Sequence, residues 1–315
     1  MAALRIIFMG TAELSRATLE SLTRDEKNFV AAVVTQPDKP RGRDLKLHPS
    51  PVKSLALNLN LPVLQPARAR DEPFIGELRA LKPDLIVVVA YGHILPPAIL
   101  EMPRHGCLNV HTSLLPKFRG AAPIQWAIAS GETETGVTVM KMDAGLDTGP
   151  IVSQRRTPIL PTDDSATLHD RLAQLGAELL AQTIPNFVAG KIRPQPQPAE
   201  GASHAPKIKK EDGHIDWNRP AGMIWNRLRA FTPWPGAFTF LDEKPKPQLL
   251  KIWKAEVVEQ SGAAGVVLSA GKNGIIIACG RNALRILELQ REGGRRMSAA
   301  EFLAGHALKE GGKFV

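Results

Sequence analysis

The residues best suited to chemistry lie in one short run of the chain. Asn109 and His111 stand two positions apart in the strand-like run from Cys107 to His111, so both side chains project from the same face of that strand. An asparagine amide and a histidine ring can each donate a hydrogen bond to a developing negative charge. A core histidine and a turn-forming asparagine are the alternatives without a catalytic role. Two complementary residue types on one face favour a functional site.

A third candidate, Asp147, lies in the run from Met142 to Gly149, which contains two aspartates and two glycines. Residues of these types commonly form a tight turn without any further role. The composition of the run therefore leaves a turn and a site as alternatives.

The segments around Asn109 and His111 alternate between strand and helix. The strands are predicted at 4–9, 30–35, 61–64, 85–90 and 107–111, and the helices at 15–22, 50–58 and 74–81. This alternation is typical of βαβ units around a parallel sheet. We therefore expect an α/β fold with an open, Rossmann-like, mostly parallel sheet. Ligands of such sheets bind at the carboxyl ends of the strands, where Asn109 and His111 lie.

The later segments differ in pattern. Residues 136–159 read as two strands joined by a turn too short for a crossover helix, which predicts an antiparallel addition to the sheet. A long helix is predicted at 165–188, and the proline-rich segment 191–206 is predicted to be a linker. Residues 207–315 combine one helix at 221–230 with several short strands, which favours a small C-terminal OB-like β-barrel. The domains are thus 1–190 and 207–315, and Trp217, Trp234 and Trp253 are expected in the barrel core.

The two predicted domains differ in net charge. The formal net charge of the chain is +9, of which residues 205–315 carry +7 and residues 1–204 carry +2. A basic excess of this kind suits a domain that binds a polyanion such as nucleic acid, although a solvated basic surface is the alternative. Lys207, Lys209 and Lys210, followed by Arg227 and Arg229, are the candidate phosphate contacts.

Several function classes are disfavoured. The longest nearly unbroken apolar run, 85–90, is far shorter than the roughly 20 residues of a membrane-spanning helix, and the N-terminal residues lack the features of a signal peptide. We expect no membrane partner and a cytoplasmic location. Cys107 and Cys279 are far apart in the sequence, so we expect two buried thiols, no disulfide framework and no metal site.

The run from Asn109 to Pro123 and the turn around Asp147 resemble the N10-formyltetrahydrofolate-dependent transformylase and hydrolase superfamily. Within it the likeness is greatest to the bacterial methionyl-tRNA formyltransferase family and extends over essentially the whole chain. The supporting motifs are Thr35-Gln36-Pro37-Asp38, Ala90-Tyr91-Gly92, Lys207-Ile208-Lys209-Lys210 and Pro233-Trp234-Pro235. One departure is Ala12, where the family usually has proline at the start of a helix.

The resemblance implies a catalytic trio of Asn109, His111 and Asp147. The reaction would move the formyl group of N10-formyltetrahydrofolate to the α-amino group of initiator methionyl-tRNA, release tetrahydrofolate and serve translation initiation. Asn109 and His111 would donate to the formyl oxygen as it gains charge, and Asp147 would accept the amine proton directly or through water. No metal is required. Four further residues, Ser113, Leu114, Leu115 and Pro116, are assigned to tetrahydrofolate, with Tyr91 in the opposite wall.

The acceptor substrate requires cationic contacts in both domains. Arg43, in a basic loop at the ligand-binding end of the sheet, is expected to grip tRNA together with Lys207, Lys209 and Lys210. A formyltetrahydrofolate hydrolase, or a transformylase acting on an amino sugar or a nucleotide, would leave the basic domain without a polyanion. A tRNA-binding protein with an inactive transformylase-like domain would not need the trio. Because one chain supplies both domains, we expect a monomer.

Overall fold

The computed structural model of the protein describes residues 3–41, 46–242 and 247–315. The described chain forms two compact units. The first comprises Met1–Pro123, Glu134–Pro158 and His169–Pro206, and the second comprises Ile124–Thr133, Ile159–Leu168 and Lys207–Val315. The sequence predicted the change of unit near residue 206 but not the two short segments that the second unit takes from the first half.

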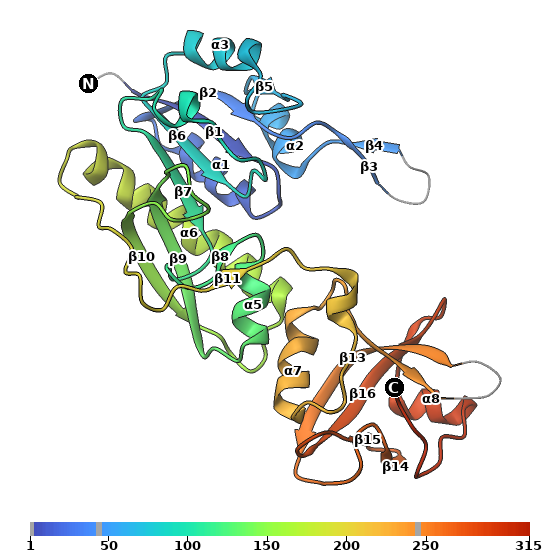
Figure 1. Cartoon of the computed structure of the whole chain (residues 1–315). Helices are drawn as coiled ribbons and strands as arrows, with labels where there is room; N and C mark the ends of the chain where they lie inside the picture. The colour runs from blue at the N-terminus through green and yellow to red at the C-terminus, as the bar shows by residue number, and fades with distance from the viewer. Residues whose placement is uncertain (1–2, 42–45, 243–246) are drawn as a thin grey trace. The chain divides into compact units, whose positions relative to one another are not determined.

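The first unit is built on a seven-stranded sheet (Figure 1). Its strands are β1 (Leu4–Gly10), β2 (Asn28–Val34), β5 (Val63–Leu64), β6 (Leu85–Val89), β7 (Cys107–His111), β9 (Glu134–Lys141) and β10 (Ile151–Pro158). They follow the order β10-β9-β7-β6-β1-β2-β5, and all run in the same direction except β9, which is antiparallel to both of its neighbours, β7 and β10. Strands β2 and β5 lie on one side of β1, and the later strands β6, β7, β9 and β10 lie on its other side. The switch point between β1 and β6 is where open α/β sheets bind their ligands.

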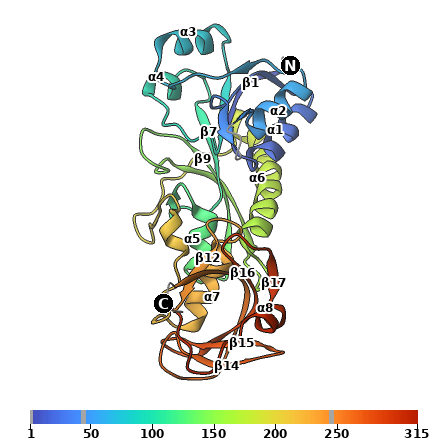
Figure 2. The same ribbon diagram turned by 90° about the vertical axis from the view of Figure 1, so that its right-hand side faces the viewer.

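Helices cover both faces of this sheet. They are α1 (Ser15–Arg24), α2 (Pro51–Asn58), α3 (Glu72–Ala80), α4 (Pro97–Leu100) and α6 (Ser165–Val188). Figure 2 shows α1, α2 and α6 on one side of the strands and α3 and α4 on the other. The start of α2 follows from its sequence, because the Ser50 hydroxyl accepts a hydrogen bond from the amide of Lys53 at 3.0 Å and Pro51 has no amide to satisfy.

The face under α3 and α4 positions the site. Side chains two apart in β1 and β6 pack there with Phe74 and Leu78 in one buried cluster. The register of the sheet places Met9, Val88, Asn109 and Met140 in one row across β1, β6, β7 and β9. Asn109 is therefore the polar member of an otherwise apolar row, between Val88 and Met140.

The second unit contains a curved antiparallel sheet. Its elements are α5 (Pro123–Ala129), η1 (Lys210–Gly213), α7 (Ala221–Ala230), β12 (Ala237–Leu241), β13 (Gln248–Val258), β14 (Val267–Gly271), β15 (Gly274–Ala278), β16 (Ala283–Arg291), β17 (Arg296–Ser298) and α8 (Ala299–Gly305). The strand order is β12-β13-β16-β15-β14, with β17 on β16.

The last residues of the chain close this sheet into a small barrel. Phe240 in β12 and Val315 exchange two backbone hydrogen bonds of 2.9 and 2.8 Å. On the opposite edge, the Gly311 amide donates to the carbonyl of Val267 in β14 at 3.0 Å. Both edge strands are thereby paired, which removes their exposed hydrogen-bonding groups.

Most elements match the sequence predictions. The strand 107–111, the helix 165–188 and the antiparallel pair within 136–159 are confirmed. The structure adds short elements that carry no periodic signal, namely β3 (Lys39–Arg41), β4 (Lys46–His48), β8 (Arg119–Gly120) and β11 (His204–Ala205). In two-residue strands the pairing comes from tertiary contacts and not from a hydrophobic repeat.

One prediction about side-chain environment needs correction. Trp217 is buried as expected, with its indole nitrogen donating to the Thr239 hydroxyl at 2.9 Å, and Trp253 is half-buried. Trp234, however, is 58% exposed, because it lies in the loop before β12 and not in the barrel core. Cys107 and Cys279 are buried and unpaired, and burial raises the pKa of each thiol to about 12.

No helix within the described residues is long and apolar enough to cross a membrane. In the same part of the chain, no three histidine, cysteine, aspartate or glutamate residues are grouped as metal ligands.

Candidate active site

A cavity of about 560 Å³ opens in the first unit at the carboxyl ends of β6 and β7. It is lined by the loop after β1, by residues 90–95 after β6, by residues 109–112, and by the run from Met142 to Asp147. This volume lies in the usual range of small-molecule sites. Ile94 is 84% exposed and Leu146 56% exposed at the cavity, so its walls offer apolar surface that a flat ring would cover.

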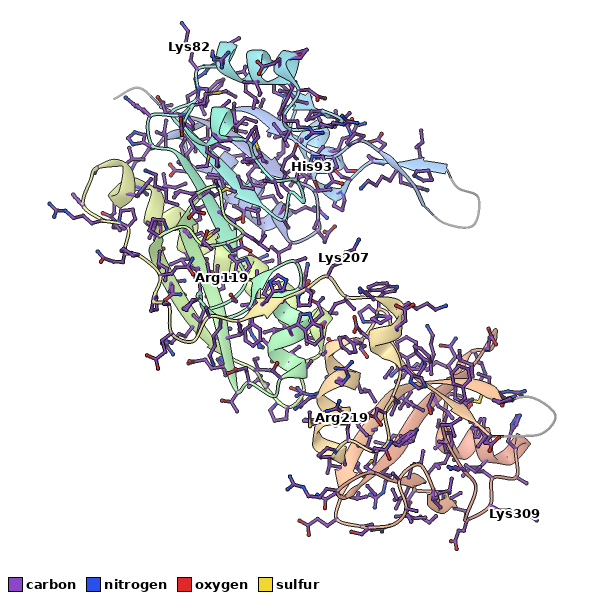
Figure 3. The ribbon with its side chains drawn as sticks, viewed as in Figure 1. Lys82, His93, Arg119, Lys207, Arg219 and Lys309 are labelled. Atoms are coloured by element: carbon purple, nitrogen blue, oxygen red, sulfur yellow. The ribbon has the colours of Figure 1, made fainter. Side chains whose placement is uncertain are left out.

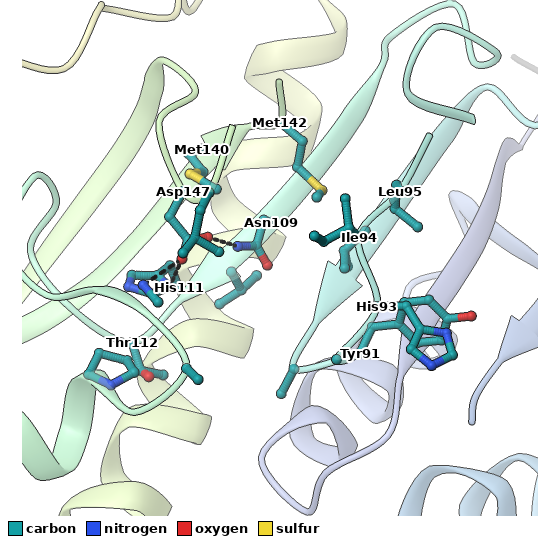
Figure 4. Close-up of a pocket in the computed structure, with 18 of the residues that line it drawn as sticks. Tyr91, His93, Ile94, Leu95, Asn109, His111, Thr112, Met140, Met142 and Asp147 are labelled. Carbon is teal, nitrogen blue, oxygen red and sulfur yellow. Dashed lines mark hydrogen bonds and ion pairs between the residues drawn. The ribbon is translucent and has the colours of Figure 1, made fainter. Parts of the chain in front are cut away.

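Asn109, His111 and Asp147 meet on one side of this cavity (Figure 4). The Asn109 amide nitrogen donates to Oδ1 of Asp147 at 3.3 Å, and Nδ1 of His111 lies 3.7 Å from Oδ2 of the same carboxylate. His111 and Asp147 are 6% and 13% exposed, so the pair is largely shielded from solvent. The fold therefore places two of the predicted residues around the carboxylate of the third, Asn109 at hydrogen-bond distance and His111 at ion-pair distance.

The backbone holds Asp147 in an unusual conformation. Its φ of 53° lies in the left-handed region, which aspartate tolerates better than most residues. The Gly120 amide donates to Oδ2 of Asp147 at 2.8 Å. Gly120 itself has a φ of 118°, and a Cβ there would lie 2.8 Å from the carbonyl oxygen of Ala205. The close approach that delivers this amide to the carboxylate therefore requires glycine.

The two ring nitrogens of His111 have different surroundings. Nε2 lies 2.9 Å from the carbonyl oxygen of Phe118, so this nitrogen carries a proton and donates it there. Nδ1 faces Asp147 and the cavity. The Phe118 carbonyl thus leaves Nδ1 as the nitrogen available for chemistry, a detail that no sequence pattern contains.

Tyr91 lies in the opposite wall of the cavity, beside His93 (Figure 4). The two rings are 5.2 Å apart in an edge contact. The Tyr91 hydroxyl is buried and has no hydrogen-bond partner among the described residues, and burial raises the pKa of this phenol to about 12. Its carbonyl accepts hydrogen bonds from the side chains of Thr11 and Gln36 at 3.0 and 2.9 Å, which fix the loop after β6.

The predicted folate segment, residues 113–116, follows the cavity lining but is not part of it. Ser113 and Leu115 are buried, and the Leu115 amide and carbonyl bond to the Thr138 and Gln154 side chains at 3.1 and 2.8 Å. Leu114 packs on Gly136. These contacts pack residues 113–115 against β9 and β10, and the Pro116 carbonyl accepts a hydrogen bond from the Ser203 amide at 3.3 Å. The contact of this segment with folate stays a prediction.

The predicted tRNA contacts fall into two groups. Lys207, Lys209 and Lys210 are exposed, and Figure 3 shows the Lys207 side chain extending away from the ribbon. Arg227 and Arg229 instead bond to backbone carbonyls of the second unit, Arg227 to Asp212 at 2.9 Å and Arg229 to Asp163 at 3.0 Å. Desolvation lowers the pKa of both guanidinium groups. Both arginines thus have partners within the second unit, and their contact with phosphates stays a prediction. Arg43 lies outside the described residues.

The segment 191–206 is more than a linker. It belongs to the first unit, where β11 pairs with β8 and Gln195 forms a bridge with Ile151. Gln197 donates to the carbonyl oxygen of Asp147 at 2.8 Å. Alternating prolines indicate the lack of helix and central strand, but they carry no signal for such side-chain contacts.

Known proteins resemble this chain over nearly its whole length. Residues 4–184 match the family model for formyl transferase, and residues 207–307 match the model for the formyl transferase C-terminal domain. The methionyl-tRNA formyltransferase of Geobacter sulfurreducens is 50% identical over 311 residues, covering 99% of this chain and 96% of the relative. That of Caldanaerobacter subterraneus is 53% identical over 311 residues, covering 98% and 99%.

Solved structures share the fold at lower identity. An N-formyltransferase from Helicobacter canadensis, in complex with folinic acid and dTDP-3-aminofucose, aligns with a TM-score of 0.65 and 20% identity, covering 91% of this chain and 99% of that one. HypX from Aquifex aeolicus, in complex with tetrahydrofolic acid, aligns with a TM-score of 0.63 and 19% identity, covering 96% of this chain and 47% of that one.

Proposed function

This chain belongs to the methionyl-tRNA formyltransferases of the formyl transferase family, and on that premise we propose how its residues perform the reaction. The enzyme transfers the formyl group of N10-formyltetrahydrofolate to the α-amino group of methionyl-tRNA. The observation that carries the proposal is the meeting of Asn109, His111 and Asp147 at a cavity of suitable size. Sequence identities of 50% and 53% to the two methionyl-tRNA formyltransferases, over nearly the full length, support methionyl-tRNA as the acceptor.

The cavity fits the donor. Its exposed apolar residues Ile94 and Leu146 can sandwich a flat ring, and backbone groups of residues 90–95 can bond to the ring edge. The bound donor supplies an activated formyl carbon, which the amine attacks. The side chains of the trio lie together on one side of the cavity, and we propose that the formyl carbon binds beside them.

We assign Asp147 as the proton acceptor. Its carboxylate is held by the Gly120 amide and the Asn109 amide, and the remaining lone pairs can take the proton that leaves the attacking amine. Asn109 has a second amide hydrogen that can bond to the formyl oxygen as charge develops. His111 can add a second donor from Nδ1 in its imidazolium form, because Nε2 already donates to Phe118.

The exposed basic residues are proposed to bind the acceptor substrate, tRNA. Lys207, Lys209 and Lys210 are exposed cations and are proposed phosphate contacts, and Arg43 is proposed as a further contact. Both substrates of the reaction are supplied by cytoplasmic translation and one-carbon metabolism, so we place the enzyme in the cytoplasm. We propose a monomer, since the site is complete within one chain.

The test is a formyl-transfer assay with purified full-length protein. With donor and charged initiator tRNA, we expect formylmethionyl-tRNA and tetrahydrofolate in equal amounts. Asn109→Ala, His111→Ala and Asp147→Ala should each lower kcat by about 100-fold or more, and their combined effect should be far from additive. Tetrahydrofolate release at the same rate without tRNA would indicate a hydrolase instead. A folded Asp147→Ala enzyme with normal kcat would contradict the assigned proton acceptor.

A further inference from the structure

We infer that Gln197 is a positioning residue, which holds Asp147 for proton transfer from a segment outside the catalytic strands. The side-chain nitrogen of Gln197 donates to the carbonyl oxygens of Asp147 and Gly149 at 2.8 and 2.7 Å. Its side-chain oxygen accepts two hydrogen bonds from Arg119, at 3.1 and 2.7 Å. The amide thus uses both hydrogens and both lone pairs. Only this orientation of the amide suits two carbonyls on one side and a guanidinium on the other.

Asp147 depends on such contacts because its own loop is irregular. Backbone pairing with the sheet ends at Met142, whose amide donates to the Cys107 carbonyl, and resumes at Pro150, which accepts from Lys141. Between these points the side chain of Asp143 bonds to Gly145 and Thr148 and stabilises only the exposed tip of the loop. The left-handed φ of Asp147 is therefore held by residues from other segments.

Arg119 and Gly120 complete the arrangement. The Gly120 amide binds the Asp147 carboxylate, while the side chain of Arg119 holds Gln197 and, through it, the Asp147 main chain. The short strand β8 therefore positions both the carboxylate and the main chain of Asp147. The pairing of His204 with Arg119 and of Ala205 with Gly120 ties β8 to the segment that contains Gln197.

The geometry makes the carboxylate sensitive to this support. Asp147 is 3.3 Å from the Asn109 amide and 3.7 Å from His111, so a small loop movement breaks both contacts. Misplacement of a reacting group by about 1 Å can cost about 100-fold in rate. Loss of Gln197 should therefore reduce kcat, although Gln197 is not one of the residues that line the cavity.

The inference rests on the proposed role of Asp147, and the test uses the full-length enzyme. Gln197→Ala should lower kcat by at least about 10-fold, with KM for donor and tRNA nearly unchanged. Gln197→Glu retains the acceptor for Arg119 but loses both donors to the loop, so its kcat should fall as far. The matched control is Gln195→Ala. Its side chain is exposed and donates only to the nearby Arg193 carbonyl, so it should behave as wild type.

A double-mutant comparison separates positioning from mere stabilisation. If Gln197 acts through Asp147, then Gln197→Ala should cause no further loss of kcat in an Asp147→Asn background. Additive losses in kcat, or a wild-type kcat in both Gln197 variants, would overturn the inference. Tetrahydrofolate release is measured in every assay, so the effect is visible with either tRNA or water as acceptor. A wild-type enzyme that forms no formylmethionyl-tRNA would instead refute the proposed function.

Discussion

At the scale of single residues, we predict that the hydroxyl of the cavity-lining Tyr91 takes no part in donor binding. The hydroxyl is buried with no partner in the described part of the chain, and an unpaired buried polar group costs about 1–3 kcal/mol. We predict that Tyr91→Phe leaves the donor Kd within about twofold, because the apolar wall is kept, and does not lower the free energy of unfolding. Ligand titration and thermal unfolding would measure both. Tyr91→Ala is the contrast and should weaken binding. A large rise in Kd for Tyr91→Phe would show that the hydroxyl contacts the ligand.

The same phenol predicts a pH effect. Burial raises the pKa of Tyr91 from 10.0 to about 12, so between these values the unfolded chain releases a proton that the folded chain keeps. The unfolded state then binds fewer protons, and stability falls as pH rises. We expect the stability of the wild type relative to Tyr91→Phe to decrease over this range. A constant difference between the two proteins in alkaline unfolding experiments would contradict the raised pKa.

At the scale of elements, replacing two helical glycines by alanine is predicted to have opposite effects on stability. Gly76 in α3 is exposed with nothing near its absent Cβ, so Gly76→Ala should stabilise the protein by about 0.5–1 kcal/mol. Gly176 in α6 is buried, and a Cβ there would lie 2.9 Å from a methyl carbon of Val110 in β7. Gly176→Ala should destabilise by about 1–3 kcal/mol through overpacking, partly offset by helix propensity. Chemical denaturation measures both, and equal effects would refute the close packing of α6.

The closing segment of the barrel gives a second prediction at this scale. Phe314 is 2% exposed, and its ring lies 6.0 Å from that of Trp217. Phe314→Ala should cost about 3–5 kcal/mol of stability, as for other buried phenylalanines. The control is Val315→Ala, because Val315 is 44% exposed and its backbone bonds to Phe240 are retained. Similar unfolding temperatures for the two variants would show that the barrel does not depend on this closure.

At the scale of the whole molecule, the charge excess of the second domain should govern tRNA affinity. Replacing Lys207, Lys209 and Lys210 together by alanine should raise the tRNA Kd and reduce the slope of log Kd against log salt by about one per lost phosphate contact. The donor KM should not change. The control removes the same charge from exposed sites in the first unit, as Arg24→Ala, Lys27→Ala and Arg79→Ala. An unchanged salt slope in the lysine variant would exclude these residues as phosphate contacts.

The sequence alone determined the features that depend on local pattern. Alternating strands and helices predicted the open parallel sheet, and the spacing of Asn109 and His111 predicted their common face because side chains in a strand repeat every two residues. Motif resemblance supplied Asp147 and the two substrates. The charge difference between residues 1–204 and 205–315 indicated a polyanion-binding domain, because net charge depends only on which residues are present.

Tertiary structure decided the contacts between segments that are distant in the chain. Gln197 donates to the Asp147 carbonyl across 50 positions, and Arg229 donates to the Asp163 carbonyl across 66 positions. Trp234 is exposed although tryptophan usually favours a core. Such outcomes depend on which backbone groups and surfaces meet after folding. A hydrophobic repeat specifies the face of an element, but it does not specify the partner of an individual polar side chain.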